Sequence, residues 1–186
     1  MSEVRRGARD ACVCAICGSM IDGDSEDFFS APPVAFPDLV AAPAGDDISF
    51  HMSCYSSWPN REPFARQVLE HWRRESHDNP YWVEISGGTD YLLHANPDSP
   101  VVEAALVLAV SGRDIRIKIR DWEKWLATGP SADGLADFEV EALHTVARTL
   151  SEKFPTRAHV LEAARSKMSA PQKKSPRPRG GRRLTT

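Results

Sequence analysis

The chain has 186 residues, enough for one ordinary domain or two small ones. Hydrophobic residues make up 41% and charged residues 26%, so the composition excludes a wholly disordered or collagen-like chain. No apolar run approaches the roughly 20 residues of a membrane-spanning helix, and the first residues lack the apolar segment of a secretory signal. We therefore expect a cytoplasmic protein without a membrane partner.

The formal net charge of −3 conceals a division along the chain. The last 22 residues, from Arg165 onward, contain 8 basic residues and no acid, whereas the preceding part has 15 basic residues against 26 acidic ones. An acidic body repels phosphate polymers, and a basic tail attracts either such polymers or the acidic body itself. Net charge alone therefore indicates no partner.

The N-terminal third of the chain predicts a loose leader and a loop-rich unit. Residues 1–11 are small and polar, and we interpret them as the leader; the first organised unit then covers residues 12–60. Prolines in the middle of this unit exclude a long helix or a central strand. A loop of this length, with only short extended pieces, is uncommon unless its ends are tied together. The prolines are Pro32, Pro33, Pro37 and Pro43.

A second unit over residues 61–168 is expected to begin with a helix and continue as a sheet. Apolar residues recur at three- and four-residue steps over residues 63–76, which predicts an amphipathic helix. A hairpin joining residues 81–85 to residues 91–94 follows. A continuous apolar run and an alternation of isoleucine with basic residues at 115–119 then predict a second hairpin, giving an antiparallel sheet of about four strands.

The C-terminal part is expected to be helical and then disordered. Asp121 is the predicted cap of a short helix that ends at Gly129, and longer helices are expected over residues 136–150 and 155–167. Residues 169–186 consist mainly of Pro, Lys, Arg, Gly and Ser, a composition that cannot bury enough apolar surface to order itself. We expect a disordered basic tail there.

The cysteines carry the clearest chemical signal, because all four lie within the first 54 residues. Cys14 and Cys17 are separated by two residues, and His51 and Cys54 repeat that spacing after the loop. Two such pairs of sulfur and imidazole ligands are typical of a closed, tetrahedral Cys3His zinc site. Gly18 supports this interpretation, since it is free to take the positive φ that a metal-binding turn commonly needs.

Three alternatives remain for these residues. The cysteines could be thiols that pack without a metal, or they could form a disulfide, although a reducing compartment disfavours that bond. Cys12 could replace Cys14, but only Cys14 has the two-residue spacing to Cys17. Zinc is favoured energetically, because closing the loop costs about 3 kcal/mol, whereas a structural zinc ion contributes on the order of 10 kcal/mol.

The segments Cys14-Ala-Ile-Cys17-Gly18 and Phe50-His51-Met-Ser-Cys54-Tyr55 resemble the two halves of a treble-clef zinc finger, as in LIM- and RING-type modules. The resemblance implies that a knuckle supplies the first ligand pair and the start of a helix supplies the second. The intervening loop is longer than LIM spacing allows, and a second ligand quartet is missing. Ubiquitin transfer, which goes with the RING type, is therefore not carried over.

No motif predicts a catalytic residue. The sequence lacks a nucleophile elbow, a phosphate-binding glycine loop and a His-Glu-x-x-His helix. His71 and Glu75 share one helix face and are interpreted as a surface pair. Four further histidines are expected to be isolated and exposed or half-buried: His77, His94, His144 and His159.

The sequence thus predicts an α+β fold with a treble-clef-like zinc module, a small antiparallel sheet, C-terminal helices and a disordered basic tail. The favoured function is that of a non-enzymatic binding or adaptor protein with a structural zinc ion, whose partner is another protein. One alternative is a nucleic-acid-associated protein that uses the zinc module and the tail, and another is a metal-dependent hydrolase or nuclease. The basic residues of the tail are Lys173, Lys174, Arg177, Arg179, Arg182 and Arg183.

Overall fold

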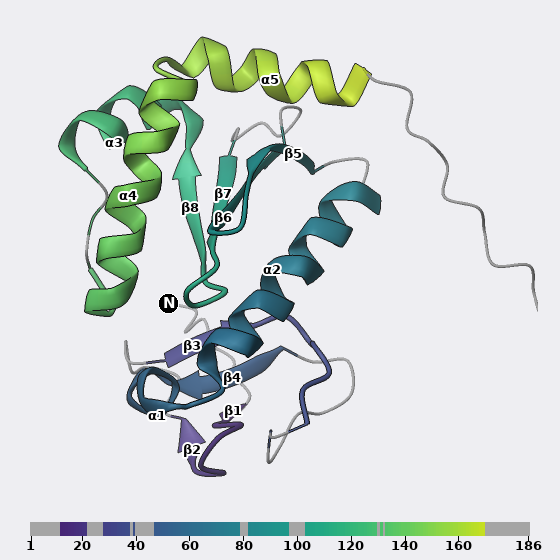
Figure 1. Cartoon of the computed structure of the whole chain (residues 1–186), viewed down its shortest axis with the longest axis vertical. Coiled ribbons are helices and arrows are strands. Elements are labelled where there is room, and N and C mark those ends of the chain that lie inside the picture. The colour runs from purple at the N-terminus through teal and green to yellow at the C-terminus, as the bar shows by residue number, and fades with distance from the viewer. Residues whose placement is uncertain are drawn as a thin grey trace, which may run out of the picture.

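The predicted α+β architecture is confirmed by a computed structural model of the chain, shown in Figure 1. The predicted leader over residues 1–11 and residues 170–186 of the predicted tail lie outside the described residues. The division of the chain at residue 60 stays a prediction. The structure describes residues 12–21, 28–37, 39, 47–78, 82–96, 103–129, 131 and 133–169.

The N-terminal part consists of two small hairpins and a short helix. β1 (Cys12–Val13) pairs antiparallel with β2 (Met20–Ile21), and β3 (Phe28–Ala31) pairs antiparallel with β4 (Ile48–His51). The helix α1 (Met52–Ser57) follows β4 directly. β3 is one of the short extended pieces that the proline-rich loop was predicted to contain.

An aromatic cluster forms the core of this N-terminal part. Phe50 and Tyr55 are fully buried, with their ring centroids 5.1 Å apart. Phe64 lies edge-on to Phe50 at 5.3 Å, although it belongs to the next helix, α2 (Arg61–Asp78). The predicted helix over residues 63–76 is therefore present, and its first turns complete the N-terminal core.

The predicted four-stranded sheet is an antiparallel meander. Its strands are β5 (Val83–Gly87), β6 (Tyr91–Asn96), β7 (Glu103–Leu108) and β8 (Asp114–Lys118), hydrogen-bonded in that order. The isoleucine alternation ends one residue earlier than predicted, because Ile119 begins a short 3-10 turn and does not continue β8.

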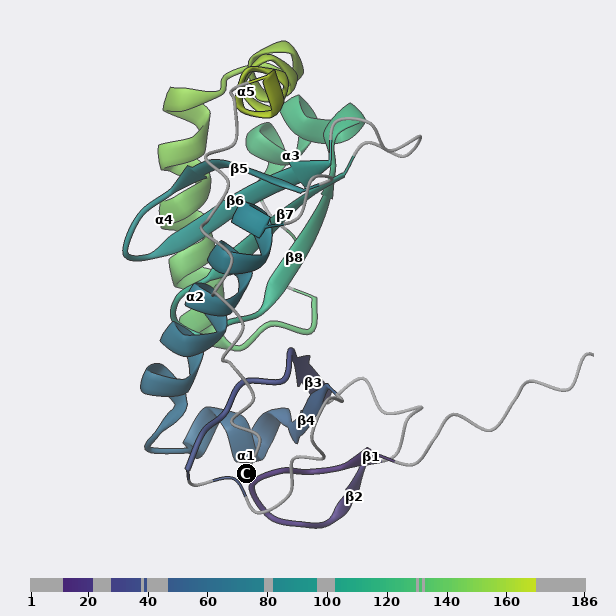
Figure 2. The ribbon, with the colours of Figure 1, turned by 90° about the vertical axis from the view of Figure 1, so that its right-hand side faces the viewer.

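Helices cover both faces of this sheet, as Figures 1 and 2 show. On one face, Leu92 and Val107 contact Leu69 of α2. On the other face, Leu93 and Leu106 belong to a larger apolar cluster that the C-terminal helices complete. Because both faces are buried, β6 and β7 are apolar at almost every position and show little alternation.

The three C-terminal helices are α3 (Trp122–Thr128), α4 (Asp137–Lys153) and α5 (Arg157–Ser169). The predicted capping role of Asp121 is wrong: the residue holds the N-cap position, but its side chain makes no capping bond and instead pairs with Arg120 at 3.5 Å. No helix in the described part of the chain is long and apolar enough to cross a membrane.

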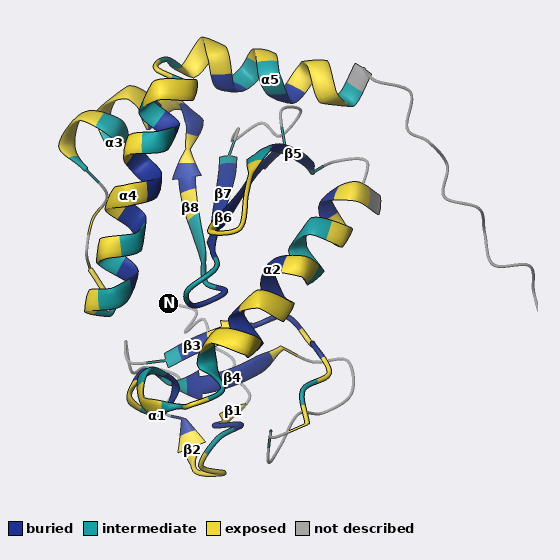
Figure 3. Ribbon diagram, in the orientation of Figure 1, coloured by how far each residue is buried: buried dark blue, intermediate teal, exposed yellow. Residues whose placement is uncertain are grey.

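The turn between β7 and β8 joins the sheet to the N-terminal part. The Tyr55 hydroxyl donates a hydrogen bond of 2.6 Å to the Ser111 carbonyl, and both residues are fully buried. Gly112 has a φ of +69° and packs so closely on Val68 that a Cβ there would lie 2.8 Å from the valine Cβ. The buried surfaces of the two regions thus meet at this turn (Figure 3).

Candidate metal centre

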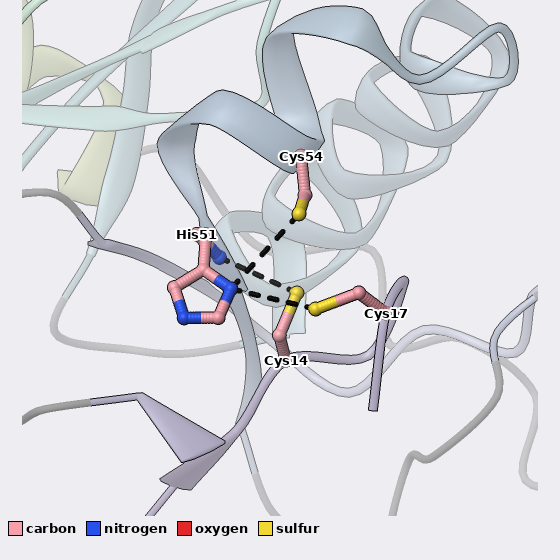
Figure 4. A group of neighbouring side chains, drawn as sticks. All are labelled: Cys14, Cys17, His51 and Cys54. Atoms are coloured by element: carbon pink, nitrogen blue, oxygen red, sulfur yellow. Dashed lines mark hydrogen bonds between the residues drawn. The ribbon is translucent and has the colours of Figure 1, made fainter. Parts of the chain in front are cut away.

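Four side chains that the sequence singled out converge at one point of the N-terminal part (Figure 4). The sulfur atoms of Cys14, Cys17 and Cys54 and one ring nitrogen of His51 all lie within 4.8 Å of one another. Two ligands come from the β1–β2 hairpin and two from the junction of β4 with α1. The centre therefore connects the two ends of the proline-rich loop.

The first ligand pair lies on a tight turn. The Gly18 amide donates to the Cys14 carbonyl at 2.8 Å, and the Cys14 amide donates to the Ser19 carbonyl at the same distance. Gly18 has a φ of +73°, the positive value that the sequence predicted. This backbone geometry directs the side chains of Cys14 and Cys17 to the same side.

The second ligand pair lies where a strand becomes a helix. His51 is the last residue of β4 and the N-cap of α1, with an extended φ of −65° and ψ of 137°. Cys54 follows three residues later, so it lies on the same side of the first helical turn. The His51 amide also donates a hydrogen bond to the Cys14 sulfur at 3.4 Å, which connects the two ligand pairs.

The spacing of the four atoms fits a tetrahedral zinc ion. Zinc binds sulfur at about 2.3 Å and imidazole nitrogen at about 2.0 Å, so neighbouring ligand atoms in a tetrahedron lie about 3.6–3.8 Å apart. Nδ1 of His51 is 3.5 Å from the Cys17 sulfur and 3.9 Å from the Cys54 sulfur. These two separations are close to the tetrahedral values, whereas the limit of 4.8 Å for the whole group exceeds them, so the ligand atoms would move closer together around a bound ion.

A hydrogen bond on the far side of the imidazole sets its tautomer. Nε2 of His51 lies 3.3 Å from the Met20 carbonyl, which accepts a hydrogen and cannot donate one. With Nε2 protonated, neutral His51 directs the lone pair of Nδ1 toward three sulfurs. A metal ion can accept this lone pair, and without one the Cys17 thiol can donate a hydrogen bond to Nδ1 over 3.5 Å.

The acid–base properties of these four side chains make metal binding dependent on pH. Hydrogen bonds from the Ser19 amide and hydroxyl lower the pKa of Cys17 to about 6, whereas burial raises the pKa of Cys54 to about 11. The hydrogen bond with Cys17 raises the pKa of His51 above its usual value. A metal must displace the protons of His51 and Cys54, so its affinity should increase with pH.

Other predicted sites are not part of this centre. Cys12 is exposed on β1, opposite Ile21, and lies outside the four-ligand group. His71 is half-buried on α2, with its ring 5.8 Å from that of Trp72. The tail residues predicted to bind nucleic acid lie outside the described residues: Lys173, Lys174, Arg177, Arg179, Arg182 and Arg183.

The prediction of an exposed or half-buried His94 is wrong. His94 is only 4% exposed, and its Nδ1 lies 2.8 Å from the Ser76 hydroxyl of α2. Burial lowers the pKa of His94 to about 4. Its burial could have been predicted from the sequence, because His94 follows Leu92 by two residues in a strand and therefore lies on the same face of the sheet, against α2.

The fold and this site define an α+β protein with a Cys3His cluster that could hold a metal ion. Comparisons with protein-family models, with curated proteins and with solved structures give no significant match.

Proposed function

We propose that the four-ligand cluster is a structural zinc site within a treble-clef-like module of a binding or adaptor protein. The observation that carries this proposal is the convergence of three sulfurs and one imidazole nitrogen within 4.8 Å. This soft and borderline donor set is the one that zinc prefers in closed protein sites. The treble-clef assignment is supported by the order of a ligand-bearing knuckle, a hairpin and a helix that starts at the third ligand.

A structural role accounts for the ligands better than a hydrolytic one. Four protein ligands fill a tetrahedral shell and leave no position for a reactive water molecule. The strands that the ion would stabilise are also very short, since β1 and β2 have two residues each. Such strands need an additional constraint to persist.

The surface of the knuckle supports a protein partner. Val13 and Met20 lie directly opposite each other on β1 and β2, and their exposed fractions are 38% and 60%. An exposed apolar pair on a rigid, metal-bound hairpin is suited to contact another protein. Four reduced cysteines are compatible with the cytoplasmic location that we propose.

Metal analysis of matched cysteine variants tests the zinc site. We expect one zinc ion per purified wild-type chain, its loss in Cys54→Ser, and its retention in Cys12→Ser, because Cys12 lies outside the cluster. Thiol titration before and after chelation should expose three further thiols. A folded wild-type protein without metal, or loss of metal in Cys12→Ser alone, would contradict the assignment.

Variants of the apolar pair test the adaptor role separately. Met20→Glu should keep the metal but lose partner proteins that the wild type captures in an extract of its native host. Thr145→Glu, at an exposed position of α4, serves as the control and should capture the same proteins as the wild type. If Met20→Glu also captures the same proteins, the knuckle is not the contact surface.

A further inference from the structure

The outward face of α2 carries basic side chains that have no counterion among the described residues. Arg66 and Arg74 are exposed on this helix, and Lys167 is exposed near the end of α5. Among the residues that the structure describes, these three side chains make no hydrogen bond or ion pair. Unbalanced cations are unexpected here, because the chain before Arg165 has 26 acidic and only 15 basic residues.

The three cations line two adjoining surface hollows. One hollow, of about 570 Å³, lies between α2, β5 and α5 and is lined by Arg74, His77 and Lys167. The other, of about 510 Å³, lies between α2 and residues 33–35 and is lined by Arg66 and Arg74. Because Arg74 lines both, the hollows form one elongated depression along the helix.

One arginine partly balances the two acidic groups among the described residues of this face. Glu70 lines both hollows and Glu84 lines the first, so each could oppose an anionic ligand. Arg73 forms an ion pair with Glu70 and lies 3.9 Å from the Glu84 carboxylate. Its guanidinium also donates to the Gly88 carbonyl at 2.8 Å, which holds it in place. Across both hollows the described lining has four arginine and lysine side chains against two carboxylates, so a net charge of +2 remains for an anionic ligand.

We propose that this depression binds the phosphodiester backbone of a nucleic acid. Arg66 and Arg74 are eight residues apart, which corresponds to about 12 Å along a helix. A single small phosphate cannot bridge that distance, whereas successive phosphates of one strand can. Among the residues that the structure describes, the lining of the hollows contains no phenylalanine, tyrosine or tryptophan for base stacking, which favours electrostatic binding that is independent of sequence. The lining of this surface contains none of the four side chains of the candidate metal centre.

Charge reversal in the full chain tests this proposal. The variant Arg66→Glu, Arg74→Glu, Lys167→Glu is compared with Lys124→Glu, Arg148→Glu, Arg157→Glu, which changes three exposed cations on α3, α4 and α5 and alters net charge equally. The probe is a fluorescent oligothymidine of about 20 nucleotides, measured by anisotropy over a range of salt concentrations. We expect the first variant to bind about tenfold more weakly at low salt and to reduce the log–log salt slope by about 2, since each single-strand phosphate contact contributes about 0.7. The control should stay within about twofold of the wild type.

Circular dichroism and metal content establish that both variants are folded; should the triple variant fail to fold, Arg74→Gln replaces it, with an expected loss of about threefold. Equal weakening by the two triple variants would overturn the proposal, because net charge would then explain the binding. Absence of binding by the wild type at low salt would also overturn it. Displacement of the oligonucleotide by poly-glutamate or inorganic phosphate at matched ionic strength would assign the surface to another anion.

Discussion

The N-terminal part and the sheet with its helices reach stability by different means. Strands β1 and β2 have two residues each, and β3 and β4 have four, whereas every strand of the larger sheet has five or six. The larger sheet is buried on both faces by apolar side chains. The N-terminal part has one aromatic cluster and the Cys3His cluster that could hold a metal ion.

This difference indicates where each region is vulnerable. A region with short strands and a long proline-rich loop depends on a constraint that acts across the loop, because loop closure opposes folding. A sheet that is covered on both faces loses stability mainly when its packing is disturbed. The turn between β7 and β8 connects the two regions and decides how far a local change spreads.

Loss of one of the four proposed metal ligands should have the largest effect on the stability of the N-terminal part. Cys54→Ser should release the metal and open the N-terminal part, since structural zinc contributes on the order of 10 kcal/mol. Hydrogen exchange should show lost protection of amides in β1 to β4 and retained protection in β6 and β7. His71→Ala is the control and should keep both metal and protection. Equal loss of protection in β6 and β7 would show that the two regions unfold as one unit.

A cavity in the larger sheet should destabilise that sheet and leave the metal bound in the N-terminal part. Leu106 is fully buried, so Leu106→Ala should lower the free energy of unfolding by about 2–5 kcal/mol. Urea unfolding monitored by tryptophan fluorescence measures this change, and metal analysis of the folded variant should still find a full complement. Release of metal without denaturant would contradict the separation of the two regions.

Acid should weaken the larger sheet through His94. Because burial lowers its pKa to about 4, from a value near 6.5 in the unfolded chain, the unfolded state binds the additional proton between those values. Stability should therefore fall as pH falls from about 6.5 to 4, with a contribution of about 2 kcal/mol lost by pH 5. Urea unfolding of the wild type and His94→Gln at pH 7 and pH 5 isolates this contribution. Identical pH dependence of the two proteins would refute it.

Loss of the hydrogen bond between the two regions should have the smallest effect on stability. Tyr55→Phe removes the hydrogen bond to the Ser111 carbonyl and leaves a buried acceptor without its donor, which costs about 1–2 kcal/mol. We expect this loss in urea unfolding and, by hydrogen exchange, faster opening of the turn that contains Gly112. Unchanged stability and exchange would mean that packing alone joins the two regions.

Local patterns predicted much of the fold. The steps between Phe64, Val68 and Trp72 were sufficient for α2, because helix periodicity is a property of neighbouring residues. The alternation at Ile115 and Ile117 likewise predicted β8. The capping role of Asp121 was wrong, since a capping bond depends on side-chain orientation and Arg120 competes for the carboxylate.

The sequence by itself determined the four candidate ligands, because their two-residue spacings already place each pair on one turn. Only the tertiary structure decided that the two pairs meet, that His94 is buried beneath α2, and that cations without a partner among the described residues line a depression beside α5. Each of these outcomes depends on residues far apart in the chain. Spacing along the chain determines which side chains share one turn. Packing between distant elements determines which other side chains lie next to them.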